Sequence, residues 1–393
     1  RSRRQRQMCI RDSEEAGAFG DVHFIGVGTP QRPGAFAADM SFVDSAVEQI
    51  SRHLTRDAVI AGKSTVPVGT ARRLRELARE NAPEGIEVDL VWNPEFLREG
   101  HSVEDTLHPD RMVIGLPGHG SADPQEREQA QRLESLMREV YAPQLAEGIP
   151  LIVTDYETSE LVKVAANSFL ATKISFINSL SELTEAVGGD IRTLADAIGM
   201  DERIGRKFLN AGVGFGGGCL PKDIRALRAR ASELGLDQSV RFLAEVDDIN
   251  TRRREHTVGV ITDMLDGSVM GREIAVLGAA FKPESDDVRD SPALDIAARL
   301  HSIGADVHVY DPKANENAAK RYPRVDYASS LIQAVARAEV VVLLTEWDEF
   351  RRMTPQDLAP LVRRRQILDG RNVLDPQQWI DADWTYRALG RRG

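Results

Sequence analysis

The sequence has very little cysteine and lacks any long apolar run. Cys9 and Cys219 are the only cysteines among 393 residues, which is too few for a disulfide framework and leaves no pattern for a zinc site. No apolar run reaches the roughly 20 residues that cross a bilayer, and the first residues do not resemble a signal peptide. The sequence therefore predicts a cytoplasmic protein that has no metal site and does not bind membranes.

The chain also lacks the positive charge that nucleic-acid binding requires. Its net charge is -11, whereas binding to a phosphate backbone depends on a broad basic surface. A small anionic ligand is still compatible with local lysines and arginines. With 42% hydrophobic and 28% charged residues, the composition is typical of a globular protein, and the length suits two or three domains.

Short apolar runs alternate with amphipathic helical patterns in two parts of the chain. This alternation predicts an α/β fold with two Rossmann-like parallel-sheet domains. Between them, residues 157–187 are apolar around most of a helical circumference, which predicts a long buried helix that connects domains or packs against a second subunit. We predict four segments in chain order. Residues 1–21 are a non-native or disordered arginine-rich extension, residues 22–154 are the first α/β domain, residues 155–265 are the helical domain and residues 266–393 are the second α/β domain.

The most unusual stretch is residues 210–223, where five glycines precede Cys219. Glycine backbone can approach a ligand closely, and ordinary packing offers no evident reason for so many glycines. A helix is predicted from Asp223 to Leu234, and its dipole together with Lys222 would favour the thiolate of Cys219. A buried structural cysteine is the alternative. The surrounding residues favour a nucleophile.

Two further pairs of residues are candidates for chemistry. Lys163 and Asn167 are four residues apart on one face of the central helix, where they either lie at a solvated edge or form a buried pair that stabilises an oxyanion. Residues 93–100 predict a short helix with Asn-Pro at its start, which places Glu95 and Glu99 on one face. These two carboxylates either complement the helix N-terminus or lie at a ligand site beyond a strand of the sheet.

No complete dinucleotide-binding fingerprint is present in the sequence. Gly26 and Gly28, and the glycines of residues 212–216, resemble parts of one but lack the full Gly-x-Gly-x-x-Gly turn between a strand and a helix. The loop at residues 278–282 does follow a predicted strand. It is either a surface loop or a phosphate-binding loop in which Lys282 and Arg289 supply positive charge.

Taken together, the motifs resemble those of the nucleotide-sugar dehydrogenases, the UDP-glucose/GDP-mannose dehydrogenase family. The resemblance extends from Val22 to the C-terminus and rests on motifs at residues 63–69, 93–100, 163–176, 214–223, 278–291 and 369–372. It implies an N-terminal Rossmann domain that binds NAD, a central helix that forms a homodimer, and a C-terminal Rossmann-like domain that binds the nucleotide sugar.

The resemblance also implies a reaction, the NAD-dependent four-electron oxidation of UDP-glucose to UDP-glucuronate. Cys219 matches the nucleophile that forms a thiohemiacetal and then a thioester. Asp223 and Lys163 match the groups that handle the proton of the sugar hydroxyl, and Glu95 matches the residue that activates water for hydrolysis. Lys163 and Asn167 would stabilise the oxyanions.

Ligand contacts follow from the same resemblance. The residues that match contacts to NAD are Thr29, Thr65, Glu99, Lys222 and Arg289. The residues that match contacts to the nucleotide sugar are Phe215, Gly216, Phe281, Lys282, Arg371, and Arg203, which is expected to reach the site of the neighbouring subunit. GDP-mannose or a UDP-N-acetylhexosamine is the alternative substrate.

The start of the chain departs from the family pattern. The first strand, the glycine turn and the acidic residue that follows the second strand should all precede Val22, but a βαβ unit takes about 30 residues. The sequence therefore predicts an N-terminally truncated NAD-binding domain and a chain that binds NAD poorly and is inactive or nearly so. A catalytically inactive module that binds a nucleotide sugar is the alternative class of function.

Overall fold

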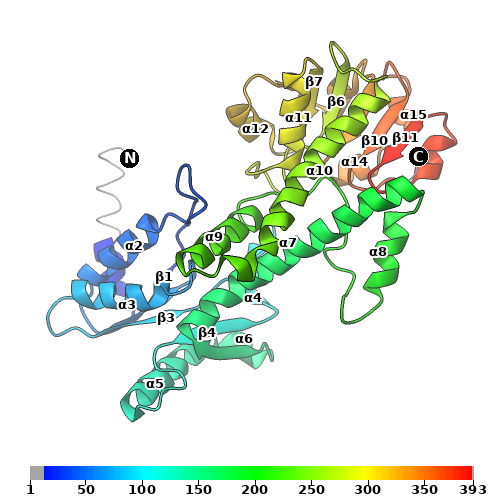
Figure 1. The fold of residues 1–393 in the computed structure, drawn as a ribbon. Helices are drawn as coiled ribbons and strands as arrows, with labels where there is room; N and C mark the ends of the chain where they lie inside the picture. The colour runs from blue at the N-terminus through cyan, green and yellow to red at the C-terminus, as the bar shows by residue number, and fades with distance from the viewer. Residues whose placement is uncertain (1–12, 392–393) are drawn as a thin grey trace. The chain divides into compact units, whose positions relative to one another are not determined.

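The computed structural model describes residues 13–391, which form two compact units (Figure 1). The first unit contains the residues up to 166 and residues 225–238, and the second contains residues 167–224 and those from 239 onward. Each unit has its own sheet, as the predicted α/β fold requires. The helical segment at residues 155–265, which the sequence assigns to a middle domain, is divided between the two units.

The first unit is built on a five-stranded sheet with the strand order β1-β2-β3-β4-β5. Its strands are β1 (Val22–Ile25), β2 (Ala58–Gly62), β3 (Val88–Trp92), β4 (Met112–Leu116) and β5 (Leu151–Asp155). β1, β2 and β3 are parallel, but β4 meets β3 in the antiparallel direction and then pairs in parallel with β5. The prediction of an all-parallel sheet is wrong at this step. The connection between β3 and β4 contains one six-residue helix, α4 (Ser102–Leu107).

Helices cover both faces of this first sheet. Alternate residues of β2 point to opposite sides, so that Ile60 packs with α2 (Ser41–Arg52) and α3 (Thr70–Asn81), whereas Val59 packs with α5 (Pro124–Val140). Successive side chains of a strand point to opposite faces, and β2 is buried on both of them. The helix α6 (Ala142–Ala146) follows α5.

Two local predictions for the first unit differ from the structure. Residues 13–19 are helical, and Gly17 packs so closely against His53 that a Cβ would lie 2.5 Å from its carbonyl oxygen. The predicted extension at residues 1–21 is therefore helical where it is described, and residues 1–12, including Cys9, lie outside the described residues. The polar residues 117–131 also predict a loop, but it ends early, because Asp123 caps α5 by accepting a hydrogen bond from the Gln125 amide.

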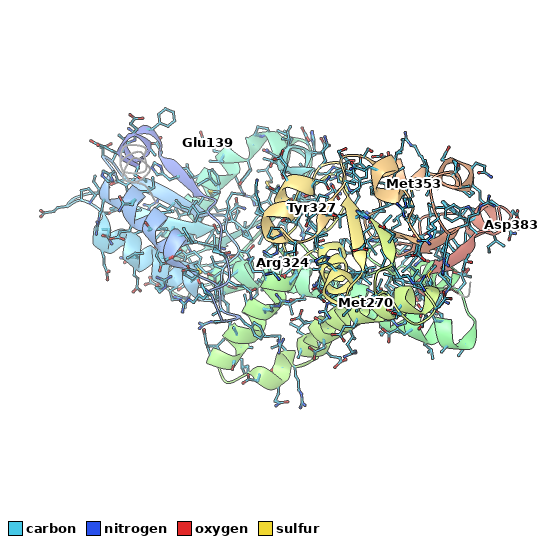
Figure 2. All side chains as sticks on the ribbon, turned by 90° about the horizontal axis from the view of Figure 1, so that it is seen from above. Glu139, Met270, Arg324, Tyr327, Met353 and Asp383 are labelled. Atoms are coloured by element: carbon cyan, nitrogen blue, oxygen red, sulfur yellow. The ribbon has the colours of Figure 1, made fainter. Side chains whose placement is uncertain are left out.

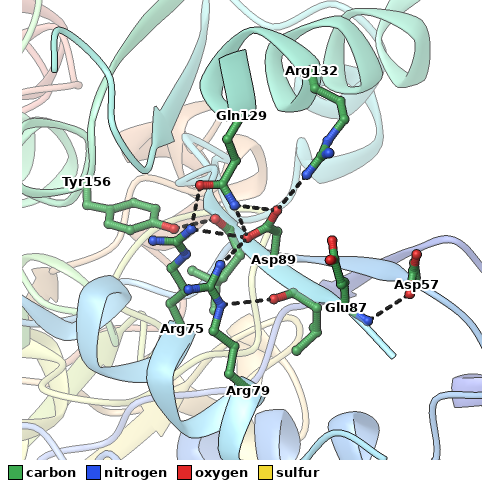
Figure 3. Close-up of polar contacts among 10 residues, drawn as sticks. Asp57, Arg75, Arg79, Glu87, Asp89, Gln129, Arg132 and Tyr156 are labelled. Atoms are coloured by element: carbon green, nitrogen blue, oxygen red, sulfur yellow. Dashed lines mark hydrogen bonds and ion pairs between the residues drawn. The ribbon is translucent and has the colours of Figure 1, made fainter. Parts of the chain in front are cut away.

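A network of buried charge fixes helices on both faces of the first sheet (Figure 3). Asp89 on β3 accepts hydrogen bonds from Arg75 and Arg79 of α3, at 3.3 and 2.9 Å, and from Gln129 of α5 at 2.8 Å. Arg132, also on α5, approaches the second carboxylate oxygen to 3.4 Å. One strand residue thus ties together the two helices that flank the sheet.

The second unit is built on a six-stranded parallel sheet with the order β11-β10-β9-β6-β7-β8. Its strands are β6 (Glu273–Leu277), β7 (Asp306–Tyr310), β8 (Asp326–Tyr327), β9 (Val340–Leu343), β10 (Gln366–Asp369) and β11 (Thr385–Ala388). The connecting helices are α11 (Pro292–Ser302), α12 (Asn315–Arg321), α13 (Leu331–Val335), α14 (Asp348–Arg351), α15 (Pro355–Leu358) and α16 (Pro376–Ile380). Tyr327 and Asp383 mark the two edges of this sheet in Figure 2. This strand order is that of a Rossmann fold.

The remaining elements are helical. They are α7 (Tyr156–Val187), α8 (Ile191–Gly199), α9 (Leu220–Glu233), the short 3₁₀ helix Asp237–Val240, and α10 (Phe242–Met264). The predicted long helix is confirmed as the 32-residue α7, but it is not buried all round, since Phe169 and Val187 are 66% and 73% exposed. Within residues 13–391, no helix is both long and apolar enough to cross a membrane.

Candidate active site

The glycine-rich loop before α9 is tightly packed against the segment that follows β6. A Cβ on Gly217 would lie 2.8 Å from the ring of Phe281, and one on Gly218 would lie 2.3 Å from the guanidinium carbon of Arg289. Gly217 also has a φ of +84°, which disfavours other residues. The backbone amide of Gly217 donates to the carbonyl of Arg289 at 2.8 Å.

This packing corrects one argument from the sequence. Close contacts with neighbouring atoms explain these glycines, so their number alone does not indicate a ligand. The structure does, however, bring the loop against two segments that the sequence proposes as binding segments. Glycine is required at residues 217 and 218 because the loop before Cys219 passes within van der Waals distance of Phe281 and Arg289.

Two buried polar side chains that the sequence did not single out hold the backbone of the same loop. Asn250 of α10 is 1% exposed, accepts the amide hydrogen of Phe215 at 2.7 Å and donates to its carbonyl at 3.0 Å. Arg253, one helical turn later, donates to the carbonyl of Gly212 at 2.9 Å. Their partners lie 35 and 41 residues away, so no local sequence signal could identify them.

Cys219 is an exposed residue at the N-terminus of α9. Its carbonyl accepts the hydrogen bond from the Asp223 amide at 2.9 Å, so α9 begins at Leu220, earlier than predicted. The thiol therefore lies where the backbone amides and dipole of a 14-residue helix stabilise a negative charge.

A buried polar cluster lies within the first turn of the same helix. Asp223 is 1% exposed, accepts a hydrogen bond from the amide nitrogen of Asn167 at 2.6 Å, and pairs with the Lys222 ammonium at 2.8 Å. The structure thus brings together three predicted site residues, one from α7 and two from α9. Because the Asn167 amide is bonded to a carboxylate, its orientation is fixed.

Lys163 lies in the first unit and forms an ion pair with Glu95. Its side chain is 7% exposed, its ammonium is 3.3 Å from the Glu95 carboxylate, and it lies 5.6 Å from the centre of the Phe96 ring. Lys163 is therefore buried rather than placed at a solvated edge, and its role at an oxyanion stays a prediction.

The predicted short helix at residues 93–100 is absent. The Asn93 side chain does not cap a helix but donates to the carbonyl of Val113 on β4 at 2.8 Å. The Glu95 carboxylate folds back to accept the Leu97 amide at 2.5 Å. The Asn93 side chain, which was expected to cap the helix, is thus bonded to β4 instead. Without a helix, Glu95 and Glu99 do not share a helical face.

Lys63 is a further residue at this corner that the sequence did not single out. It directly follows β2, and its ammonium donates to the Asn93 side-chain oxygen at 2.9 Å and to the Tyr141 hydroxyl at 3.3 Å. Burial lowers the pKa of Lys63 to about 8, although the charge of Glu95 acts in the opposite direction. A lysine placed directly after a parallel strand was a signal that could have been used.

The carboxyl edge of β1 and β2 is open at two glycines and carries polar side chains. The Thr29 hydroxyl donates to the Thr65 carbonyl at 2.8 Å and so links the loops that follow the two strands. A Cβ on Gly26 or Gly28 would meet no atom within 4 Å. Open α/β sheets bind ligands at this edge.

The residues predicted to contact the cofactor do not all belong to this edge. Thr29, Thr65 and Glu99 belong to the first unit, whereas Lys222 and Arg289 belong to the second. In the second unit, Arg289 forms an ion pair with Asp287 while its guanidinium packs on the glycine loop.

Arg371 connects the predicted sugar-binding residues of the second unit. Its guanidinium donates to the carbonyls of Leu344 at 2.6 Å, Gly214 at 3.3 Å and Phe281 at 3.4 Å. Lys282 lies next to this group, with its ammonium 5.6 Å from the Phe281 ring centre.

The other predicted sugar-binding residues differ in their surroundings. Phe215 is buried, and a Cβ on Gly216 would lie 2.4 Å from the carbonyl of Asp290. Arg203 is exposed and pairs with Asp201 at 2.6 Å, so the single chain does not bring it to Arg371.

A cavity of about 220 Å³ opens beside Arg371 in the same unit. Four arginines and one carboxylate line it, namely Arg192, Arg206, Arg351, Arg371 and Glu346. This excess of positive charge suits an anionic ligand such as a diphosphate, because one guanidinium group can donate two parallel hydrogen bonds to phosphate oxygens. The sequence identified only Arg371 of these four arginines.

Models of three domains of one family match this chain. They are the NAD binding domain at residues 2–144, the central domain at 157–252 and the UDP binding domain at 275–376, all of the UDP-glucose/GDP-mannose dehydrogenase family. The match from residue 2 gives no support to the predicted truncation, and the NAD-binding domain is present.

Curated and solved proteins show the same similarity. The UDP-glucose 6-dehydrogenase of Rickettsia typhi is 40% identical over 374 residues, which are 95% of this chain and 82% of that protein. The UDP-glucose 6-dehydrogenase of Rhizobium meliloti is 41% identical over 380 residues, 97% of this chain and 84% of that protein. The structure of a UDP-glucose dehydrogenase from the hyperthermophilic archaeon Pyrobaculum islandicum superimposes with a TM-score of 0.84 at 34% identity, and the match covers 97% of this chain and 82% of that one.

Proposed function

Because this chain belongs to the UDP-glucose/GDP-mannose dehydrogenase family, we propose that it oxidises the C6 alcohol of UDP-glucose to the carboxylate of UDP-glucuronate. The chain is an NAD-dependent oxidoreductase with a nucleotide sugar as its ligand. The choice of UDP-glucose is supported by relatives of that name at 40% and 41% identity. The arginine-lined cavity of the second unit supports a ligand that carries a diphosphate.

Bound NAD supplies the hydride acceptor in each of the two oxidations. The residues proposed to hold it are Thr29, Thr65 and Glu99 from the first unit and Lys222 and Arg289 from the second. In the first oxidation, the buried Asp223 takes the proton of the C6 hydroxyl through water while the C6 hydride departs.

In the second oxidation, the Cys219 thiolate adds to the aldehyde carbon to give a thiohemiacetal. Loss of the second hydride gives a thioester, so the reactive aldehyde stays attached to the chain between the two steps. The Lys163 ammonium and the Asn167 amide stabilise the oxyanions. Glu95 then takes a proton from water, the resulting hydroxide attacks the thioester, and Cys219 leaves as a thiolate.

The observation that carries this proposal is the position of Cys219. Cys219 is exposed at the N-terminus of α9, and the buried Asp223 in the first turn of that helix contacts Asn167 of α7 and Lys222. A structural cysteine would be expected to lie inside the core, without a polar cluster of this kind beside it.

An assay of NAD reduction with UDP-glucose tests the proposal. We expect two molecules of NADH for each molecule of UDP-glucuronate, and no acid from the Cys219→Ala variant. Acid production by that variant at the normal rate would refute the covalent route. Preferential turnover of GDP-mannose or a UDP-N-acetylhexosamine would show that this other nucleotide sugar is the substrate. The predicted lack of activity stays a prediction, which turnover in this assay would show to be wrong.

We also propose that the chain forms a homodimer through α7. Phe169, Phe176 and Leu183 recur every seven residues and are 66%, 50% and 58% exposed, so they form an apolar stripe along one face of the helix. A Phe176→Asp variant is expected to shift the protein from dimer to monomer in analytical ultracentrifugation. A monomeric unmodified protein would contradict the proposal.

A further inference from the structure

The ammonium of Lys63 lies at the corner that carries Glu95. Lys63 directly follows β2 and Asn93 directly follows β3. The backbone amide of Asn93 donates to the Gly62 carbonyl at 2.8 Å, which extends the pairing of the two strands by one residue. This register places the two side chains next to each other. The Lys63 ammonium and the Tyr141 hydroxyl both donate to the side-chain oxygen of Asn93.

Asn93 is held at both ends of its amide. It is 2% exposed, and its nitrogen donates to the Val113 carbonyl while its oxygen accepts from Lys63 and Tyr141. Pro94, whose φ is fixed by its ring, is the only residue between Asn93 and Glu95. The position of the Glu95 backbone therefore follows from the position of Asn93, and that position depends on Lys63.

Lys63 also acts on this corner through its charge. Its ammonium lies 5.6 and 5.8 Å from the ring centres of Phe24 and Tyr141. Of the ionisable groups that face it, Tyr141 has a pKa raised to about 12 by burial and so remains neutral, and Glu95 is the carboxylate within electrostatic reach. Glu95 in turn pairs with Lys163 on its other side.

We propose that Lys63 is a positioning residue for Glu95, acting through Asn93, and that it serves the hydrolysis of the Cys219 thioester rather than the two oxidations. The inference rests on the proposed function, since it requires that Cys219 forms a thioester. In that step water adds to the thioester carbon, Glu95 takes the water proton, and the carbon–sulfur bond breaks. Lys63 exchanges no proton with the substrate and keeps the carboxylate in place.

The test compares Lys63→Met with Glu95→Gln by rapid mixing with UDP-glucose and NAD. Both variants should produce a fast burst of NADH and then a steady rate at least about tenfold below that of the unmodified enzyme. Mass spectrometry of the acid-quenched intact protein should show a covalent sugar adduct that disappears in Cys219→Ala. Lys320→Met is the matched control, because it removes the ammonium of an exposed lysine in the second unit, and it should not accumulate the adduct.

The other outcomes are also decisive. If Glu95→Gln accumulates the adduct and Lys63→Met does not, or if Lys63→Met slows the burst as much as the steady rate, Lys63 has no specific role in hydrolysis. If neither variant accumulates an adduct, the thioester itself is refuted and the inference falls with the proposed function.

A second measurement follows the hydrolysis step as a function of pH and uses no variant that removes the Lys63 charge. Hydrolysis of the adduct in the unmodified enzyme, followed in a single turnover, should slow as the pH rises through about 8, where Lys63 loses its proton. In Lys63→Arg this decline should move to higher pH, because arginine stays protonated. An identical profile in the two proteins would overturn the proposal.

Discussion

Asp89 and Asp223 are both buried carboxylates on regular elements, yet their surroundings differ in kind. Asp89 is surrounded by the guanidinium groups of Arg75, Arg79 and Arg132 and by the Gln129 amide. Asp223 contacts one amide and one ammonium, those of Asn167 and Lys222, and lies one helical turn from Cys219. A carboxylate surrounded by excess positive charge holds elements together, whereas one with fewer partners beside a nucleophile has the capacity to exchange a proton.

The ionisation of Asp89 supports this contrast. Burial alone would raise its pKa, but the hydrogen bond from Gln129 and the charge of Arg75 outweigh burial and hold the pKa below its usual value. A carboxylate that stays ionised in this way is a poor proton acceptor near neutral pH. We therefore assign Asp89 to stability and Asp223 to catalysis.

The largest expected effect is that of Asp223→Asn on turnover. The variant keeps an acceptor for the Asn167 amide but cannot take a proton, so we expect kcat to fall by about 10² to 10⁴, while the unfolding free energy changes by less than about 1 kcal/mol. Steady-state assays and chemical denaturation measure both quantities. A large loss of stability with normal kcat would reverse the comparison.

Asp89→Asn should produce the opposite pattern. It leaves three arginines around a neutral amide, which should lower the unfolding free energy by about 3 kcal/mol because one partner of a buried ion network is removed. Turnover per folded molecule should stay close to normal. Asp326→Asn is a suitable control, because this carboxylate is 82% exposed and lies 3.9 Å from His308. Equal losses in the two variants would show that the network adds little.

The smallest expected effect is that of Glu160 on the pH dependence of stability. Glu160 is intermediate between Asp89 and Asp223. This 2% exposed carboxylate accepts the Gly69 and Ala71 amides at the start of α3, yet burial raises its pKa to about 7 against those hydrogen bonds. Because the folded pKa lies above the unfolded value, the native state holds the proton longer. Stability should therefore be highest below pH 4.5 and should fall as the pH rises from there to 7.

Chemical denaturation at several pH values would measure this slope. In Glu160→Gln the side chain stays neutral, so the part of the slope that Glu160 causes should disappear. A variant with the same pH dependence as the unmodified protein would show that Glu160 is not the group responsible.

Much of the fold could be predicted because it depends on local periodicity. The alternation of short apolar runs with amphipathic patterns predicts the two α/β sheets, and the long helix predicted at residues 157–187 is found as α7, Tyr156–Val187. The antiparallel step at β4 could not be predicted, because strand direction depends on the path of the chain rather than on the pattern within the strand.

The site was predicted less completely, for a related reason. Cys219 and Asp223 are close in sequence and so were found by motif, whereas the partners of Lys63 lie 30 and 78 residues away. Residues 93–100 resemble the start of a helix, but contacts with β4 and Lys63 use the polar group of Asn93 that would have capped it. Tertiary contacts overrode a local preference there.

The close approach of Gly217 to Phe281 limits which substitutions this chain can accept during evolution. A methyl group on Gly217 would need space that the Phe281 ring occupies and would strain a backbone with a φ of +84°, so an alanine at 217 requires both a smaller residue 281 and a change of the backbone. Such a change would alter a residue proposed to contact the sugar. The loop that carries the nucleophile and the segment that selects the substrate are therefore not free to diverge independently, and a lineage that changes its sugar is expected to change both.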